Sequence, residues 1–345
     1  MKRPLLLPLV PLYAAGLALR ELRLNRGWEQ TRWLWYPVIS IGNLSTGGSG
    51  KTPFAITLAC LLSARGFHVD VLSRGYGRTS REPALVSPDG TADEYGDEPL
   101  LIARKSGVPV YVATERYDAG RLAEQQFIQQ GGELSADQVP SVFILDDGFQ
   151  HRQLGREIDI LLVNRDDWHD HLLPAGNLRE PQSAANRANI LAMPASESGF
   201  DAELRSWGWT GPIWRVHRRM EIPQIAGPVV AFCGIARPEQ FFAGLRSASL
   251  SLAAEIVFAD HHRYAASDIQ NLVASARRKG AMALITTEKD EIRLRDLKSA
   301  FPAELPLEAA RLNVEIEDEQ NAVATLEELL SNTRLAQSHR KVSQR

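Results

Sequence analysis

A glycine-rich loop at residues 45–52 constrains the fold more than any other part of the sequence. It follows an apolar, strand-like run and precedes a helical stretch. Gly50, Lys51 and Thr52 match the end of the phosphate-loop pattern G-x-x-x-x-G-K-[ST], although Ser45 stands where that pattern has its first glycine. Glycines give such a loop the dihedral angles that turn its backbone amides inward around phosphate oxygens. We therefore expect nucleotide binding by Thr46, Gly47, Gly48, Ser49, Gly50, Lys51 and Thr52.

A second element typical of this class of site is an apolar strand that ends at Asp146 and Asp147. A carboxylate in that place holds Mg²⁺ directly or through water, and the residues alone do not choose between the two aspartates. Lys51 is expected to reach the β- and γ-phosphates, and Thr52 to offer its hydroxyl to Mg²⁺. The nearest candidate for guanine recognition, at 286–290, has the wrong spacing, so ATP is the expected nucleotide.

The alternation of apolar runs with helical stretches predicts an α/β fold. Short, β-rich runs bounded by turn residues recur along the chain, with helices between them. This pattern predicts a P-loop NTPase core with a mostly parallel sheet, plus a second, smaller α/β domain. The expected divisions are an N-terminal apolar and basic segment at 1–36, a core domain at 37–215, a connector at 216–228, a smaller domain at 229–335 and a polar tail at 336–345.

Composition narrows the range of partners. The chain has 345 residues and a net charge of −3, which gives no reason to expect a nucleic-acid partner, and no obligate protein partner is implied. Its two cysteines, Cys60 and Cys233, each lie in an apolar run. We expect both to be buried, reduced thiols rather than part of a metal cluster or a disulfide framework.

The N-terminal segment allows more than one interpretation. Residues 4–19 are uncharged, which is short for a spanning helix of ~20 residues, and prolines interrupt them. A positive start before an apolar run also imitates a signal peptide, but no convincing cleavage site follows. Leu12, Leu19 and Leu22 can share one helix face, and Trp28, Trp33 and Trp35 follow. The segment is either a helix lying in the headgroup layer or an ordinary helix docked on its own domain.

Several clusters suit the acceptor side of a phosphoryl transfer. A kinase needs a hydroxyl-bearing substrate and usually a carboxylate that takes its proton. The acidic stretch 93–99 offers candidates, although a solvated loop is the alternative. The Asp-His-His sequence within 259–264 suits an imidazole that orients a carboxylate better than a metal site, because adjacent histidines seldom share one ion. Arg74, Arg78 and Arg179 lie on probable loops where a guanidinium can clamp a phosphate.

Taken together, the motifs resemble those of a known family. The motif series of the tetraacyldisaccharide 4'-kinases is similar, in order, to IGNLSTGGSGKTP, LSRGYGR, GDEP, LDDGFQHRQLGREIDI, LLPAGNLREP, FCGIARPEQFF, DHHRY and TTEKD, across roughly residues 37–295. That family makes the 4'-phosphate of lipid A in Gram-negative bacteria. The resemblance implies ATP-dependent phosphorylation of the 4'-hydroxyl of a tetraacyl disaccharide 1-phosphate at the cytoplasmic face of the inner membrane.

The resemblance also implies roles for individual residues. By motif position, Asp97 resembles the family's catalytic carboxylate, and either His261 or His262 resembles its partner. The resemblance also suggests Arg179 as a substrate contact and Glu180 as a metal contact. The roles of the phosphate loop and of the acidic pair are unchanged.

A multi-acylated sugar is insoluble as a monomer, so its kinase must work at a bilayer surface. The N-terminal segment suits such shallow, peripheral attachment. A different class remains as the alternative function: a P-loop nucleotide switch or targeting NTPase, whose hydrolysis signals rather than modifies a metabolite.

Overall fold

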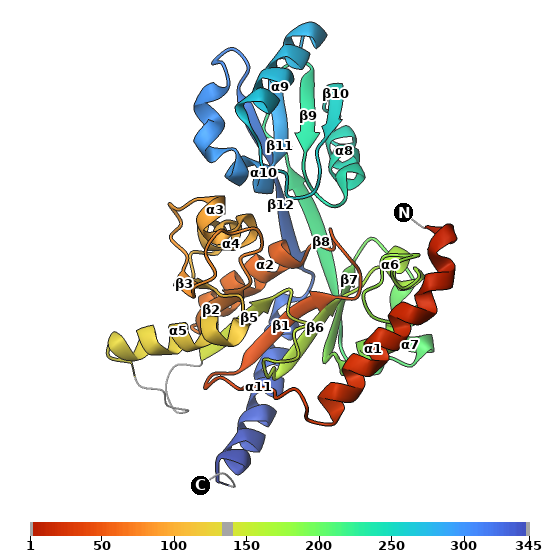
Figure 1. Ribbon diagram of the computed structural model, residues 1–345, viewed down its shortest axis with the longest axis vertical. Helices are drawn as coiled ribbons and strands as arrows, with labels where there is room; N and C mark the ends of the chain where they lie inside the picture. Colours follow the sequence, from red (N-terminus) through yellow and green to blue (C-terminus); the bar gives the residue numbers. More distant parts are fainter. Residues whose placement is uncertain (1–2, 133–140, 343–345) are drawn as a thin grey trace.

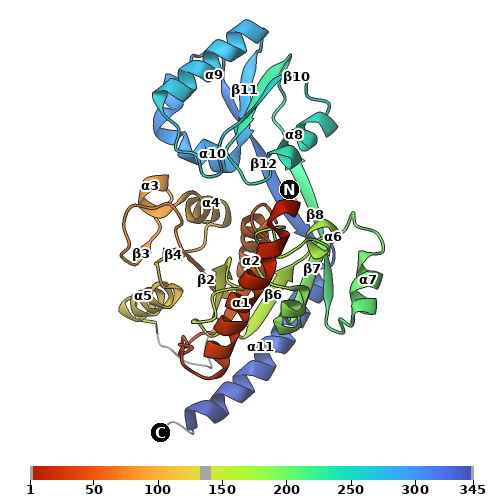
Figure 2. The ribbon, with the colours of Figure 1, turned by 45° about the vertical axis from the view of Figure 1, so that its right-hand side comes forward.

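The computed structural model describes residues 3–132 and 141–342. One twelve-stranded sheet runs through this part of the chain and joins two bodies of unequal size (Figure 1, Figure 2). The strand order is β10-β9-β11-β12-β8-β7-β6-β1-β5-β2-β4-β3. Neighbouring strands are parallel except in the pairs β8–β12 and β3–β4. The predicted α/β class with a mostly parallel sheet is therefore confirmed.

The larger body, called the core body here, is built around the phosphate loop. Its strands are β1 (Val38–Asn43), β2 (His68–Ser73), β3 (Ala84–Leu85), β4 (Val110–Val112), β5 (Ser141–Asp146), β6 (Ile158–Leu162) and β7 (Ile190–Pro194). Its helices are η1 (Pro4–Leu9), α1 (Val10–Asn25), α2 (Lys51–Ala64), α3 (Ala92–Tyr95), α4 (Asp97–Ser106), α5 (Arg116–Gln129), α6 (Arg165–Trp168), η2 (Gln182–Arg187) and α7 (Phe200–Trp207).

The smaller body lies at the far end of two long strands, β8 (Ile213–Glu221) and β12 (Leu307–Ile316) (Figure 1). Its other elements are β9 (Val229–Cys233), α8 (Pro238–Ser247), β10 (Leu252–Val257), α9 (Ala266–Lys279), β11 (Ala283–Thr287), α10 (Glu288–Arg293) and η3 (Arg295–Ala300). The last helix, α11 (Glu319–Val342), returns to the core body.

Burial explains why the central strands read as unbroken apolar runs. All six residues of β1 and all six of β5 are buried, as expected for parallel strands covered on both faces. On one face α2 packs into the core through Phe54, Leu58 and Leu62, which are fully buried. On the other face Ala119 of α5 packs against Phe143 of β5.

The chain between the bodies differs from the expected connector at 216–228. Residues 216–221 are the second half of β8, paired antiparallel with β12. Val216 is buried, whereas the three residues after it are exposed. Both faces of this two-stranded ribbon are exposed and carry polar side chains. The sequence of the strand therefore lacks the alternation of apolar and polar residues by which a strand is recognised.

The end of the chain also lies outside the expected smaller domain. Val314 and Ile316 of β12, together with Ala322 and Leu326 of α11, are buried in the same cluster as α2. The smaller body is therefore an insertion, and the chain leaves and re-enters the core body through β8 and β12. Helix α11 continues to Val342, through most of the expected polar tail.

The cysteine prediction is half wrong. Cys233 is buried in β9, but Cys60 is exposed on α2, and both are free thiols. The face of α2 that carries Cys60 points away from the apolar cluster that buries most of the helix. An apolar stretch of sequence thus contains one position on the outer face of a helix, which hydrophobicity alone does not identify.

The N-terminal helices run along the outside of the core body, against the loops that carry Gln150, Arg152 and Arg179 (Figure 1, Figure 2). Polar contacts dock them: the Arg20 guanidinium donates to the Gln150 carbonyl, and Glu21 pairs with Arg152. Six of their leucines are left exposed, namely Leu5, Leu7, Leu9, Leu12, Leu19 and Leu22. The stretch Pro4–Leu24 is long and apolar enough to cross a membrane by length and composition, and none of it is buried. The segment is thus docked by its polar side, as an ordinary helix would be, and bare on its apolar side, while its place in the headgroup layer stays a prediction.

Candidate active site

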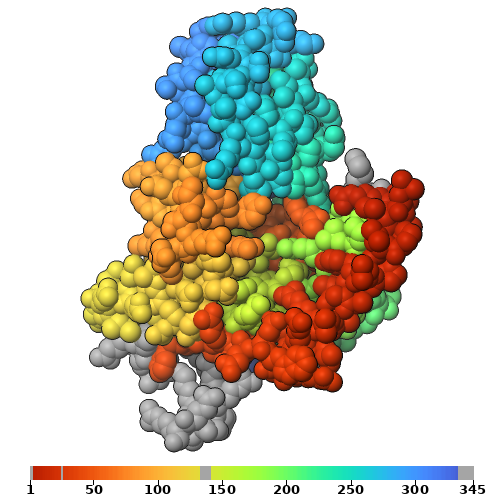
Figure 3. Space-filling view, viewed as in Figure 1, coloured from red at the N-terminus to blue at the C-terminus, as the bar shows by residue number. Residues whose placement is uncertain are grey.

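A cavity of about 850 Å³ lies between the core body and the smaller body. The surface is hollowed where the two bodies meet (Figure 3). The carboxyl ends of β1, β2 and β5 open into it through residues 46–53, Ser73 and Arg74, and the pair Asp146 and Asp147. Ligands of open α/β sheets bind at this edge, outside the carboxyl ends of the strands. The phosphate loop and the acidic pair therefore face one space, as the sequence predicts.

The phosphate loop has the geometry that its glycines predict. Gly50 has φ of +84° directly before α2, a left-handed conformation that side chains rarely adopt. The Lys51 ammonium donates to Asn43 Oδ1 at 3.0 Å and lies 3.5 Å from Asp147 Oδ1. Ser45, which replaces a glycine, is buried and donates its hydroxyl to Asp167 Oδ2 at 2.7 Å. Serine is tolerated there because its side chain ties the start of the loop to α6.

The two aspartates of the acidic pair differ in their surroundings and in their pKa values. Asp146 is buried at the end of β5, and burial, with the charges of Glu98 and Asp147, raises its pKa to about 7. Asp147 has φ of +50° and lies against Lys51 and Arg179. Burial alone would raise the pKa of Asp147, but these two cations lower it to about 2.

The residues present fit Mg²⁺. Within the described part of the chain, Asp146 Oδ1 is buried and has no hydrogen-bond partner. Thr52 is buried at the start of α2 and lines the same cavity. A magnesium ion that shares its coordination with nucleotide phosphates needs only one or two carboxylates from the protein. The unsatisfied buried oxygen of Asp146, beside the phosphate loop, could provide such a ligand.

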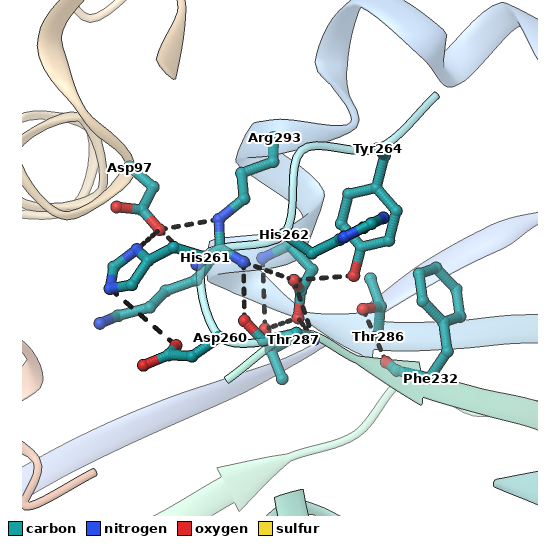
Figure 4. Close-up of polar contacts among 12 residues, drawn as sticks. Asp97, Phe232, Asp260, His261, His262, Tyr264, Thr286, Thr287 and Arg293 are labelled. Carbon is teal, nitrogen blue, oxygen red and sulfur yellow. Dashed lines mark hydrogen bonds and ion pairs between the residues drawn. The ribbon is translucent and has the colours of Figure 1, made fainter. Parts of the chain in front are cut away.

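Asp97 and His261 meet across the two bodies, as Figure 4 shows. His261 Nδ1 lies 3.2 Å from Asp97 Oδ2, and the φ of His261 is +56°. Asp97 is buried at the first position of α4, whereas His261 follows β10 and lines the cavity. Their hydrogen bond raises the pKa of His261, although burial lowers it. The neighbouring His262 instead bonds Asp268 Oδ2 at 3.0 Å, so the geometry separates the two histidines.

The predicted arginines fall into two groups. Arg74 and Arg179 line the cavity, and Arg179 bonds Asp147 Oδ1 at 3.0 Å. Arg78 donates to the carbonyls of Arg81 and Glu82, at 2.9 and 2.8 Å. Neither Arg78 nor Glu180 lines the cavity in the part of the chain that the structure describes. The Glu180 carboxylate pairs with Arg187, so its predicted metal contact would require a rearrangement.

Comparison with known proteins bears on this site. The family model described as tetraacyldisaccharide-1-P 4'-kinase matches residues 2–331. The chain belongs to this kinase family. It is 40% identical over 334 residues to the tetraacyldisaccharide 4'-kinase of Koribacter versatilis, which covers 94% of this chain and 97% of that protein. The corresponding kinase of Geobacter metallireducens is 38% identical over 308 residues, with 82% and 86% covered.

A solved structure of a family member has the same fold. The LpxK of Aquifex aeolicus, crystallised as an "apo" form in complex with ATP, matches with a TM-score of 0.69 and 32% identity. The match covers 94% of this chain and 98% of that one. The family resemblance and the P-loop kinase fold expected from the motifs are therefore confirmed. The chain thus belongs to a family of enzymes of bacterial lipid A biosynthesis.

The kinase site also contains residues that the sequence analysis did not single out. Lys289 lines the cavity from the smaller body and pairs with Glu98 at 2.5 Å. Arg237 bonds both oxygens of Asp167 at 2.7 Å, and Arg218 donates to the Ser49 carbonyl. Lys289 and Arg237 lie inside motifs that the family resemblance is based on, so their positions in the sequence could have identified them as candidate site residues. Arg218 lies in the stretch interpreted as a connector, where nothing marked it.

Arg116 is a further missed residue of this kinase. It lines the cavity from the start of α5, and its Nε is buried without a partner among the described residues. Burial, and then the charge of Arg74, lower its pKa. The unpartnered Nε of Arg116 and the neighbouring positive charge of Arg74 suit the binding of a further anion.

Proposed function

We propose that this kinase transfers the γ-phosphate of ATP to the 4'-hydroxyl of a tetraacyl disaccharide 1-phosphate. Membership of the tetraacyldisaccharide 4'-kinase family supports the substrate class. The structural observation that carries the proposal is that Lys51 of the phosphate loop and His261 of the smaller body line one cavity. A phosphate donor site and a proton acceptor thus share one space that a substrate hydroxyl can enter.

The donor side holds the triphosphate. The loop amides, the start of α2 and the Lys51 ammonium offer positive charge to the β- and γ-phosphates. Thr52, Asp146 and Asp147 would hold Mg²⁺, which neutralises charge on the transferred phosphate when it is bound. Asp147 keeps Lys51 in place, because its carboxylate lies 3.5 Å from the ammonium.

The acceptor side removes the proton of the sugar hydroxyl. Asp97 and His261 act as one unit, in which the buried carboxylate orients the imidazole through Nδ1. His261 lines the cavity, and its Nε2 lies 3.9 Å from Asp260 Oδ1, which lines the cavity as well. A neutral imidazole accepts the proton as the hydroxyl oxygen attacks the γ-phosphorus, and the carboxylate stabilises the imidazolium that forms. The oxygen–phosphorus bond to ADP breaks in the same displacement.

Cations near the cavity suit the remaining negative charge of the substrate. Arg74 and Arg116 have the placement for the 1-phosphate, and Arg179 for the transferred group. The predicted roles of Arg78 and Glu180 remain predictions, because their side chains bond elsewhere in this structure.

The kinase works at the cytoplasmic face of the inner membrane, attached peripherally through η1 and α1. The bare leucine face of these helices, and the exposed Trp28, Trp33 and Trp35, support this proposal. The chain crosses between the bodies only on β8 and β12 in the described residues, which supports relative movement of the bodies during turnover.

Phosphate transfer to the lipid tests the proposed function. The full-length protein is incubated with γ-labelled ATP, Mg²⁺ and a tetraacyl disaccharide 1-phosphate in mixed micelles, and the lipid is extracted. We expect the label in the lipid fraction. Label released only as inorganic phosphate, at a rate indifferent to the lipid, would support the nucleotide-switch alternative and reject the kinase.

A further inference from the structure

The last residue of α10, Arg293, joins the Asp97–His261 pair to the interior of the smaller body (Figure 4). Its Nε lies 2.8 Å from Asp97 Oδ2, and its Nη2 donates to the same oxygen. Its Nη1 donates to the Gly234 carbonyl at 2.8 Å and to Asp290 Oδ1 at 2.9 Å. The Arg293 side chain is only 7% exposed. All three nitrogens of the guanidinium are therefore engaged, two of them with Asp97.

The far end of this contact is rigidly held. Asp290 is fully buried, and its Oδ1 also accepts from the Tyr264 hydroxyl at 2.9 Å. Its Oδ2 accepts from Thr287 Oγ1 at 2.7 Å and from the Gly234 amide at 3.1 Å. A carboxylate satisfied by this many donors fixes the guanidinium that binds it. Arg293 therefore has one orientation that satisfies its partners.

The near end decides how Asp97 is presented. Asp97 Oδ1 accepts from the Glu98 amide at 2.9 Å, which anchors the carboxylate to its own helix. Asp97 Oδ2 is left to Arg293 and to His261 Nδ1. The plane of the carboxylate, and with it the direction of His261, is set by contacts from both bodies.

We propose that Arg293 is the positioning residue of the Asp97–His261 pair, holding the Asp97 carboxylate charged and turned toward His261 when the two bodies are together. The proposal rests on the proposed function, because it gives the pair its purpose in phosphate transfer. Arg293 itself touches neither the nucleotide nor the sugar, and acts only through Asp97.

The charges around the pair determine the expected pH effect. Burial alone would raise the pKa of Asp97, but the His261 hydrogen bond and the cations Arg293 and Lys289 lower it well below its usual range. The pKa of His261 is raised by Asp97 and by the charge of Asp260, while burial and the charge of Arg293 lower it. Arg293 in turn faces Asp290 and Tyr264. Removing the guanidinium therefore increases the proton affinity of both members of the pair.

Two substitutions of Arg293 test this role in the full-length enzyme. For Arg293→Gln we expect turnover to fall by roughly 10²-fold, with the KM for ATP changed by less than about twofold. The acidic limb of the turnover profile reports the protonation of His261. It should move to higher pH by about one unit, because loss of a nearby positive charge raises the pKa of the imidazole. Arg293→Lys keeps the charge but loses the fork, so turnover should fall while the acidic limb stays near that of the parent.

Arg295 supplies a matched control. It also joins the two bodies, through the carbonyls of Asp89 and Gly90, but its side chain is 42% exposed and pairs with Asp89 rather than Asp97. Arg295→Gln should leave the turnover and its pH profile close to those of the parent. An Arg293→Gln enzyme that behaves like Arg295→Gln would overturn the proposal. Equal losses in Arg293→Gln and Arg293→Lys, with the KM for ATP raised alike, would show a purely structural role.

A readout without catalysis separates this inference from the proposed function. The imidazole signals of His261, assigned with a His261→Gln variant, are followed by NMR against pH without nucleotide. The midpoint should rise in Arg293→Gln and remain near the parent value in Arg293→Lys; an unchanged midpoint in Arg293→Gln contradicts the proposal. If Arg293→Gln fails to fold, Arg293→Lys decides, since parent-like turnover in it overturns the proposal. A parent enzyme that transfers no phosphate to lipid rejects the proposed function, whereas the NMR midpoint still decides on Arg293.

Discussion

The hydroxyl of Tyr13 donates a 3.0 Å hydrogen bond to the backbone carbonyl of Arg179. Tyr13 belongs to α1, the helix with the bare leucine face, and the Arg179 guanidinium bonds Asp147 beside the phosphate loop. The proposed membrane-facing helix is thus attached to the loop that contributes to the phosphate site.

The leucine face should control membrane association without affecting the nucleotide site. Replacing Leu12 and Leu19 by glutamine should weaken vesicle binding by roughly tenfold or more, because both side chains are exposed and apolar. Sedimentation with anionic vesicles measures the effect, and ATP affinity serves as the internal check. Ile128→Gln, an exposed apolar position on α5, is the matched control. Unchanged sedimentation of the double variant would argue against the membrane-facing helix.

The acidic stretch 93–99 contains one aspartate whose loss should reduce turnover and one whose loss should not. Asp97→Asn should lower turnover by roughly 10²–10⁴-fold, because it removes the charge that orients His261 and stabilises the imidazolium. ATP binding should stay near that of the parent. Asp93→Asn is the control, since the Asp93 side chain is 68% exposed. Lipid kinase assays with isothermal titration of ATP check both, and near-normal turnover in Asp97→Asn would refute the role.

The two adjacent histidines should behave differently. His261→Gln should reduce turnover strongly, whereas His262→Gln should keep it within about twofold, because His262 bonds Asp268 instead. The pKa of His261 is raised above its unfolded value, so its stabilising contribution is full below about pH 6.5 and is lost as pH rises through the folded pKa. The unfolding free energy of the parent should therefore exceed that of His261→Gln by a larger margin at pH 5.5 than at pH 9. Urea unfolding at the two pH values measures this, and a pH-independent difference would contradict it.

Asp146 should lower the free energy of unfolding of the free enzyme, although turnover requires it. Its pKa is raised to about 7, so the folded state holds a proton that the unfolded chain releases above about pH 4. Stability is therefore lost as pH rises from about 4 to 7, and the buried charge opposes folding above that. Asp146→Asn should raise the unfolding free energy at pH 8, without nucleotide or Mg²⁺, by roughly 1–3 kcal/mol while turnover is lost.

Thermal unfolding with activity assays checks this prediction. Asp166→Asn, at an exposed position of α6, provides a second aspartate variant for comparison at the same pH. A lower melting temperature in Asp146→Asn would show that the carboxylate is stabilising in the free enzyme.

The sequence predicted those parts of the site that lie within single motifs. The phosphate loop needs glycine at positions such as Gly50. A buried strand that ends in Asp146 and Asp147 after such a loop is typical of a nucleotide site. The fold class followed from unbroken apolar runs such as β1 and β5, whose residues are buried on both faces.

Contacts between segments that are distant in the sequence could not be predicted from such local patterns. Arg293 binds Asp97 over a separation of 196 residues, and nothing local in either segment specifies the other. The choice between His261 and His262 depends on backbone turns that send neighbouring side chains in different directions. The strand β8 was missed because a two-stranded ribbon exposes both faces.

The insertion of the smaller body between β8 and β12 has a consequence for the modularity of the molecule. Glu221 and Arg311 are paired neighbours on the two strands, so a tight turn from one to the other would bypass the whole insert. The shortened chain would retain α11 and every strand from β1 to β7. We expect it to fold and to bind nucleotide, but to lack His261, the proposed proton acceptor.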